Sequence, residues 1–131
     1  MELKEINDRL PIEVTSQLMS SEKAYYFSYI PFEGGCGSSG EKEKYWIALT
    51  DKRVMYKTEI IEFVGDSQQS VIKDGDLPFN KISFIEISEG KKFNDIQLRI
   101  SSSGGTIVIP IPTKEKGYDI RKVYSELSKE L

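Results

Sequence analysis

The chain has 131 residues, of which 38% are hydrophobic and 30% charged, and its formal net charge at pH 7 is −3. This length and this balance predict a single globular domain over residues 1–131, with a hydrophobic core of its own. The small negative charge excludes a general attraction to nucleic acid or to an anionic membrane. The one cysteine excludes an intrachain disulfide, and the lack of histidine removes the usual general base near neutral pH and the commonest metal ligand.

The chain begins with a segment rich in charge, Met1–Glu5, and no run of residues approaches the roughly 20 apolar positions of a membrane span. We therefore expect neither a secretory signal nor a transmembrane helix. A cytoplasmic location is the expectation that follows, and the single cysteine suits a reducing compartment.

The first predicted element is a short helix. Pro11 suits the first turn of a helix, where its missing N–H costs nothing. We predict a helix over residues 11–20 with Val14, Leu18 and Met19 on its buried face.

Residues 22–112 have the apolar alternation and the regularly spaced turn residues of about seven β-strands, with no helix between them. Strands joined in this way pair antiparallel. The boundaries of the third and fourth strands, between Glu59 and Ile72, stay open, and residues 73–76 have the composition of a turn. The clearest strand segments are residues 24–30, 45–49, 82–87, 96–100 and 107–111.

The last segment changes from the period of a strand to that of a helix. Its apolar residues are spaced by three or four positions, which places them on one stripe of a helix over residues 117–131. Such an amphipathic helix has one face to bury, and we expect it to cap the core of the strands. The stripe consists of Ile120, Val123, Tyr124, Leu127 and Leu131.

Two short motifs give the chain a family resemblance. Residues 47–54, Ile-Ala-Leu-Thr-Asp-Lys-Arg-Val, resemble the hairpin between the second and third strands of the bacterial pleckstrin-homology-like domains, which are relatives of the GRAM and PH families. Residues 77–82, Leu-Pro-Phe-Asn-Lys-Ile, resemble that family's entry to its fifth strand, and the likeness extends over residues 22–131. It implies a mainly β fold: a bent, PH-like, seven-stranded antiparallel barrel, capped by the C-terminal helix and preceded by a short N-terminal helix.

The motifs that would carry chemistry are incomplete. The glycine-rich segment of residues 35–40 has the spacing of a phosphate loop, but it is not followed by lysine and then serine or threonine. Cys36 has no histidine and no positive field to generate a thiolate. Asp74 and Asp76 suggest a calcium loop that the residues after them do not complete. We predict no catalytic residue, no cofactor and no metal, and therefore no enzyme.

The candidate interaction site is the loop between the first two strands. Its charges nearly cancel, which removes the electrostatic basis for binding inositol phosphates. We expect non-catalytic binding of a protein partner, or self-assembly into a homo-oligomer, through sheet edges and loops, and no binding of nucleic acid. The alternatives left open are a peripheral membrane adaptor for lipid head groups and a small acidic inhibitor or immunity-type protein. The residues of this candidate loop are Phe32, Gly35, Cys36, Lys42 and Lys44.

Overall fold

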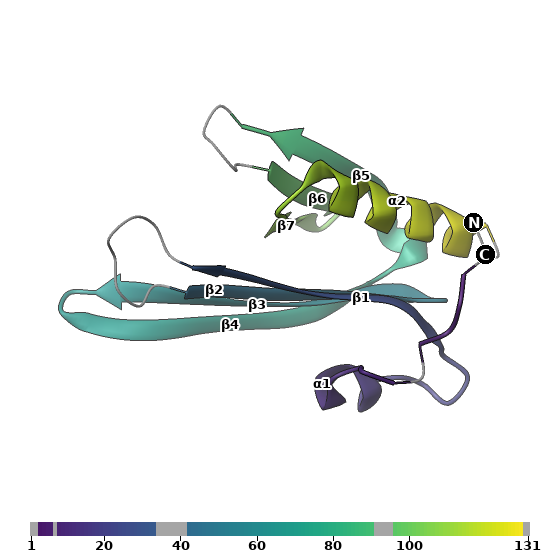
Figure 1. Ribbon diagram of the computed structural model, residues 1–131, viewed down its shortest axis with the longest axis horizontal. Helices are drawn as coiled ribbons and strands as arrows, with labels where there is room; N and C mark the ends of the chain where they lie inside the picture. Colours follow the sequence, from purple (N-terminus) through teal and green to yellow (C-terminus); the bar gives the residue numbers. More distant parts are fainter. Residues whose placement is uncertain (1–2, 7, 34–41, 91–95, 130–131) are drawn as a thin grey trace.

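The computed structural model describes residues 3–6, 8–33, 42–90 and 96–129. A short helix comes first, seven strands follow with a 3-10 turn after the fourth, and a long helix comes last (Figure 1). The elements are α1 (Ile12–Thr15), β1 (Ala24–Glu33), β2 (Lys42–Thr50), β3 (Arg53–Val64), β4 (Ser67–Pro78), the 3-10 turn η1 (Phe79–Lys81), β5 (Ile82–Glu89), β6 (Ile96–Ser102), β7 (Gly105–Pro110) and α2 (Lys114–Ser128).

All strand pairs are antiparallel, and they form two sheets. The first four strands make one sheet in the order β1-β2-β3-β4, and the last three make a second in the order β5-β6-β7. Figure 1 shows two layers, with α2 beside the three-stranded sheet and α1 on the outer face of the four-stranded one. The prediction of a mainly β fold with seven antiparallel strands and a terminal helix is confirmed.

The described strands do not close into the predicted barrel, since no ladder joins the two sheets within the described ranges. Pro78, the last residue of β4, has no N–H to contribute to a ladder, and η1 follows it at once. The backbone therefore changes direction between the two sheets and does not extend one bent sheet.

The segment whose strand boundaries the sequence left open is one long hairpin. β3 and β4 have 12 residues each and remain in register over their whole length. The prediction of a turn at residues 73–76 is wrong, because these residues lie inside β4. Gly75 belongs there for a steric reason: a Cβ at this position would lie 2.8 Å from the hydroxyl of Tyr56, so the glycine leaves room for that ring.

The N-terminal helix is shorter than the predicted span of residues 11–20, since α1 has only four residues. Two of the backbone groups that follow α1 form hydrogen bonds with side chains. The carbonyl of Gln17 accepts a hydrogen bond from Arg53 Nη2 at 2.7 Å, and the N–H of Met19 donates to Glu22 Oε1 at 3.1 Å. Bonds to the side chains of a buried ion pair thus replace the bonds of a longer helix.

α1 covers part of the outer face of the four-stranded sheet. Val14 is buried there against Trp46, Ala48 and Met55, and Leu18 packs at the border of the same cluster. Burial of Val14 was predicted correctly. The prediction for Met19 is wrong, because 55% of this residue is exposed.

α2 begins three residues before the predicted start at residue 117. The hydroxyl of Thr113 accepts a hydrogen bond from the backbone N–H of Lys116 at 3.3 Å and so caps the helix. Gly117 is buried against the three-stranded sheet, where a Cβ would lie 2.7 Å from Cγ1 of Ile87. The predicted stripe is confirmed for Ile120, Val123 and Leu127, which are buried, whereas Tyr124 is half-buried and Leu131 lies outside the described residues.

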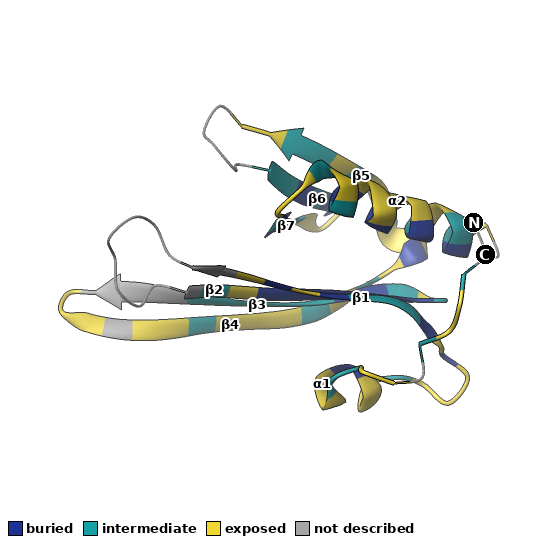
Figure 2. Ribbon diagram, in the orientation of Figure 1, coloured by how far each residue is buried: buried dark blue, intermediate teal, exposed yellow. Residues whose placement is uncertain are grey.

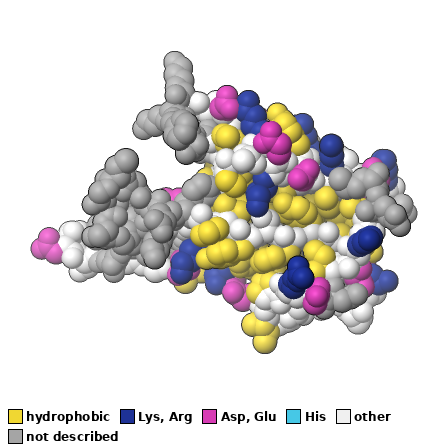
Figure 3. Space-filling view, in the orientation of Figure 1, with side chains coloured by type: hydrophobic (Ala, Val, Ile, Leu, Met, Phe, Trp, Pro, Cys, Tyr) yellow, Lys and Arg dark blue, Asp and Glu magenta, His cyan; other side chains and the backbone are white. Residues whose placement is uncertain are grey.

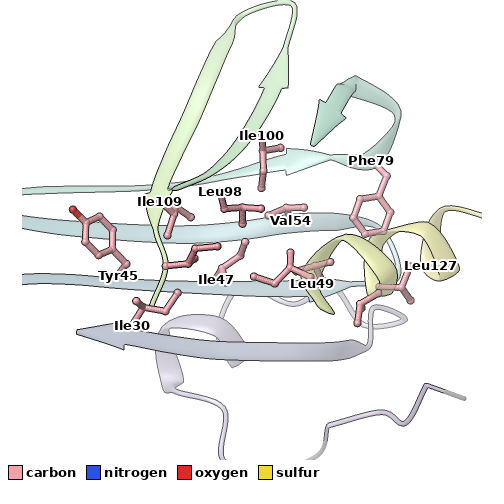
Figure 4. Packing of buried hydrophobic residues seen from close by; sticks show 13 residues of the cluster. Ile30, Tyr45, Ile47, Leu49, Val54, Phe79, Leu98, Ile100, Ile109 and Leu127 are labelled. Carbon is pink, nitrogen blue, oxygen red and sulfur yellow. The ribbon is translucent and has the colours of Figure 1, made fainter. Parts of the chain in front are cut away.

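The main core lies between the two sheets, and burial decreases along the strands. On β3, Val54 is fully buried, whereas Tyr56, Thr58 and Ile60 are only partly covered. Figure 4 shows Phe79 and Leu127 at one limit of the core cluster and Tyr45 at the other, and Figure 2 shows the projecting part of β4 as mainly exposed. We call the first limit the closed end, formed by Leu49, Val54, Phe79, Val123 and Leu127, and the second the open end, formed by Tyr45, Thr58, Ile60, Val71 and Ile107.

Candidate functional site

The predicted interaction loop lies mostly outside the described residues. Gly35 and Cys36 belong to that undescribed part, and Phe32 and Lys42 are placed only by their backbones, at the ends of β1 and β2. Lys44 is exposed on β2, on the outer face of the sheet, where it borders a surface cavity of about 120 Å³. The structure therefore neither supports nor excludes this loop as a site, and it assigns Lys44 to a different surface.

A larger depression lies at the open end, between the four-stranded sheet and β7. Its volume is about 390 Å³, and we call it the open-end groove. Its lining is mostly apolar and aromatic, with two threonines and one lysine. It is bounded by Tyr45 of β2, by Tyr56, Thr58 and Ile60 of β3, by Val71 and Lys73 of β4, and by Thr106, Ile107 and Val108 of β7.

The register of the four-stranded sheet explains how these side chains gather. Tyr45 pairs with Thr58, and Thr58 pairs with Lys73, so the three form one row across the sheet. Side chains of directly paired residues lie on the same face of an antiparallel sheet. The row that begins with Tyr45 therefore faces the second sheet, and Thr58 and Lys73 are polar residues on the inner face at the open end.

Tyr56 forms part of the groove and is held against the backbone of β4. The hydroxyl and Cζ of its ring would lie 2.8 and 3.0 Å from a Cβ at Gly75, so no side chain fits beneath the ring. Gly75 thus leaves a patch of backbone without a side chain, on which the Tyr56 ring rests.

Three residues that line the groove are titratable: Tyr45, Tyr56 and Lys73. Burial, followed by the hydrogen bond to Glu43 and its charge, raises the pKa of Tyr45 well above its usual value. The Tyr45 hydroxyl donates a hydrogen bond to Glu43 Oε2 at 2.7 Å, and the phenol therefore stays protonated. Lys73 is exposed and has no hydrogen bond or ion pair with any other residue that the structure describes. It supplies the positive charge of the groove.

The free edge of β7 runs along the groove. The N–H of Ile111 donates to the carbonyl of Ile96 at 3.0 Å, which fixes the alternation of hydrogen-bonding residues at the end of β7. Ile107 and Ile109 therefore bond to β6, and the backbone groups of Thr106 and Val108 point away from it. Pro110 is also a residue whose backbone points away from β6. Its missing N–H therefore costs no hydrogen bond between β6 and β7.

The edge of β4 differs from the edge of β7 in charge. β4 carries Lys73, Asp74 and Asp76, and charged residues of this kind discourage the pairing of a sheet edge with another chain. β7 consists of Gly105–Pro110, which contains no charged residue and is rich in β-branched ones. Of the two edges beside the groove, β7 has the composition that accepts an added strand.

The motif that carried the family resemblance has a structural role here. The Thr50 hydroxyl donates to Glu22 Oε2 at 2.6 Å and accepts hydrogen bonds from the backbone N–H groups of Lys52 and Arg53 at 3.1 and 3.0 Å. Asp51 exchanges hydrogen bonds with the backbone of Lys23. The turn between β2 and β3 is thereby tied to the segment that precedes β1.

Glu22, which sequence reasoning missed, is the centre of this network. Its side chain is fully buried, and its two oxygens accept hydrogen bonds from Nε and Nη2 of Arg53 at 2.9 and 3.0 Å. Burial by itself would raise the pKa of Glu22, but the hydrogen bonds from Arg53, Thr50 and Met19 and the charge of Arg53 outweigh it, so the pKa lies below its ordinary value. Arg53 Nη1 also donates to Asp76 at 3.1 Å. No sequence pattern marked Glu22, because its partner is 31 positions away.

Across the residues with described positions, no cluster of three or more His, Cys, Asp or Glu side chains is arranged to hold a metal ion. None of the helices in the described part of the chain has the length and apolar content needed to cross a membrane. No protein family model matches the chain, and no curated protein or solved structure shows a significant match to it.

Proposed function

We propose that the chain is a cytoplasmic, non-catalytic binding domain of the pleckstrin-homology-like type, and that it binds a partner protein in the open-end groove. The seven antiparallel strands followed by a helix are consistent with that family. The observation that carries the proposal is a groove of about 390 Å³ that runs beside the uncharged free edge of β7. Apolar pockets next to an unpaired strand edge are a recurrent arrangement for binding an extended peptide segment.

The charge distribution favours a protein partner over a lipid surface. The face drawn in Figure 3 has acidic and basic side chains mixed around the hydrophobic ones, so it offers no area of one sign to an anionic membrane. The groove itself contributes one lysine. A membrane adaptor would need several such charges close together.

Affinity purification from the native cell followed by mass spectrometry tests the proposal, using two variants of neighbouring residues. Val71→Glu places a charge in the groove, whereas Ile72→Glu alters the opposite face of β4, where Ile72 is 54% exposed. We expect a partner that is retained by the wild type and by Ile72→Glu and is lost with Val71→Glu. Retention by both variants would exclude the groove as the binding site.

Light scattering on the purified chain distinguishes a foreign partner from a second copy. If the retained partner is the chain itself, the wild type and Ile72→Glu will show the mass of an oligomer, and Val71→Glu will show that of a monomer. The fluorescence of Trp46, which is the single tryptophan and is 6% exposed, reports whether each variant is folded.

A further inference from the structure

We infer that the partner segment binds as an added strand on β7, and that it carries an acidic side chain opposite Lys73. This inference rests on the proposed function and names the chemistry of its ligand. It follows from the hydrogen-bonding direction of β7, from the charges on β4, and from the lining of the open-end groove.

The backbone of β7 offers an unused row of hydrogen-bonding groups. Thr106 and Val108 direct their N–H and carbonyl groups away from β6, since Ile107, Ile109 and Ile111 are the residues that bond to it. Within the described ranges, β7 is the last strand of its sheet. An extended segment laid along β7 would form main-chain bonds with both residues of the free row.

The edge of β4 is not suited to pairing with the β4 edge of a second copy of the chain. If two β4 edges paired antiparallel about Lys73, two lysines would lie opposite each other. Pairing about Asp74 would oppose two Asp74 residues, and pairing about Gly75 would oppose Asp74 and Asp76. Like charges in direct opposition destabilise a strand pair, so these registers are disfavoured.

The lining of the groove specifies the side chains of the segment. Alternate residues of a strand point to the same face, and those that point into the groove would contact Ile60, Val71 and Ile107. Apolar residues suit these positions. Lys73 lies on the same inner face, and it forms no hydrogen bond or ion pair with any described residue. A carboxylate on the segment would supply the missing partner.

The experiment is a selection of peptides from a display library of random nine-residue sequences on the immobilised full chain. Selection on the wild type should enrich peptides in which apolar residues alternate and one acidic residue recurs. Selection on Lys73→Glu should lose the acidic residue. Lys52→Glu, which makes the same change of charge at an exposed position of the turn between β2 and β3, should retain it.

The strand geometry is tested with a pair of variants at one position. Val108→Pro removes an outward N–H without removing a bond to β6, and Val108→Ala shortens the side chain but keeps that N–H. We expect Val108→Pro to abolish binding of a selected peptide and Val108→Ala to preserve it. Equal binding by both variants, with the Trp46 fluorescence unchanged, would overturn addition to β7.

The affinities separate the failure of this inference from the failure of the proposed function. A selected acidic peptide should bind the wild type about fivefold more tightly than its glutamine counterpart, and this preference should vanish with Lys73→Glu. If both peptides bind equally well and Val71→Glu abolishes both, the groove binds protein but the acidic specificity is wrong. If no peptide is enriched, or if Val71→Glu leaves binding unchanged, the proposed function fails and the inference fails with it.

Discussion

The closed and open ends of the sandwich are built from the same strands but are covered differently. At the closed end, Leu49 and Val54 are fully buried under Phe79 and the last turns of α2. At the open end, the same strands present Thr58, Ile60 and Lys73 to a groove. α2 contacts β1, β2, β5 and β6, and its Lys116 Nζ donates to the Ser28 hydroxyl of β1 at 2.7 Å.

This difference indicates that stability and binding depend on different parts of the strands. The closed end and the middle of the core bury their apolar side chains and so contribute to stability, since the hydrophobic contribution scales with the area removed from water. The open end contributes little to stability and keeps polar groups accessible, which is where binding residues are tolerated. Variants at the two ends should therefore separate effects on stability from effects on binding.

The largest effect is expected where the closed end is tied to the N-terminal segment. Arg53→Ala leaves the fully buried carboxylate of Glu22 without its cation, which should lower the free energy of unfolding by about 3–5 kcal/mol. Urea denaturation followed by Trp46 fluorescence measures it. As a control, Arg121→Ala removes an exposed guanidinium that lies 5.5 Å from the centre of the Tyr118 ring and should cost at most about 1 kcal/mol. Similar losses in both variants would contradict the special role of the buried pair.

The two ends are compared directly by one substitution made at each. Leu49→Ala removes a fully buried side chain of the closed end and should cost about 2–5 kcal/mol. Ile60→Ala truncates a half-buried side chain in the groove and should cost about 1 kcal/mol. Thermal and urea unfolding of the two variants check the ranking. Equal losses in the free energy of unfolding would mean that Ile60 contributes to the core as much as a fully buried residue does.

The pH dependence sharpens the comparison, because the network around Glu22 contains a carboxylate of lowered pKa. A carboxylate that is more acidic in the folded state than in the unfolded state stabilises the fold above its ordinary pKa, near 4.5, and this stabilisation is lost as the pH falls through the lowered value. The wild type should therefore be more stable than Glu22→Gln at neutral pH. The difference should shrink as the pH falls below about 4.5, and urea titrations across this range measure it. A stability difference that stays constant with pH would show that the ionisation of Glu22 does not cause the pH dependence.

The smallest effect on stability, combined with a clear effect on binding, is expected at Gly75. In Gly75→Ala the new Cβ displaces the ring of Tyr56 toward the groove, because hydroxyl and Cζ lie at 2.8 and 3.0 Å. We expect a loss of about 1 kcal/mol in stability, the low end for an overpacked site because the half-buried ring can shift, and weaker binding of a selected peptide. Adding Tyr56→Phe removes the closest atom and should restore part of the affinity, as isothermal titration would show. Unchanged binding in Gly75→Ala would mean that the ring position does not matter.

Local patterns of apolar residues are enough to predict several elements of the fold. The alternation at Ile96, Leu98 and Ile100 placed β6, and the spacing of Ile120, Val123 and Leu127 placed the buried stripe of α2. Residues 82–87 and 107–111 likewise lie within or next to the strands β5 and β7. In each case the period of the apolar residues reports which face is buried, and this needs no knowledge of distant partners.

Other features depend on contacts between residues far apart in the sequence, and local patterns do not predict them. The composition of residues 73–76 favours a turn, yet the ring of Tyr56 and the long pairing with β3 keep them in β4. α1 ends early because the backbone after it binds a pair formed by Glu22 and Arg53. The open-end groove likewise arises only where β7 passes over the inner face of the four-stranded sheet. Local propensities amount to about 1 kcal/mol per residue or less, and buried polar pairs and close packing outweigh them.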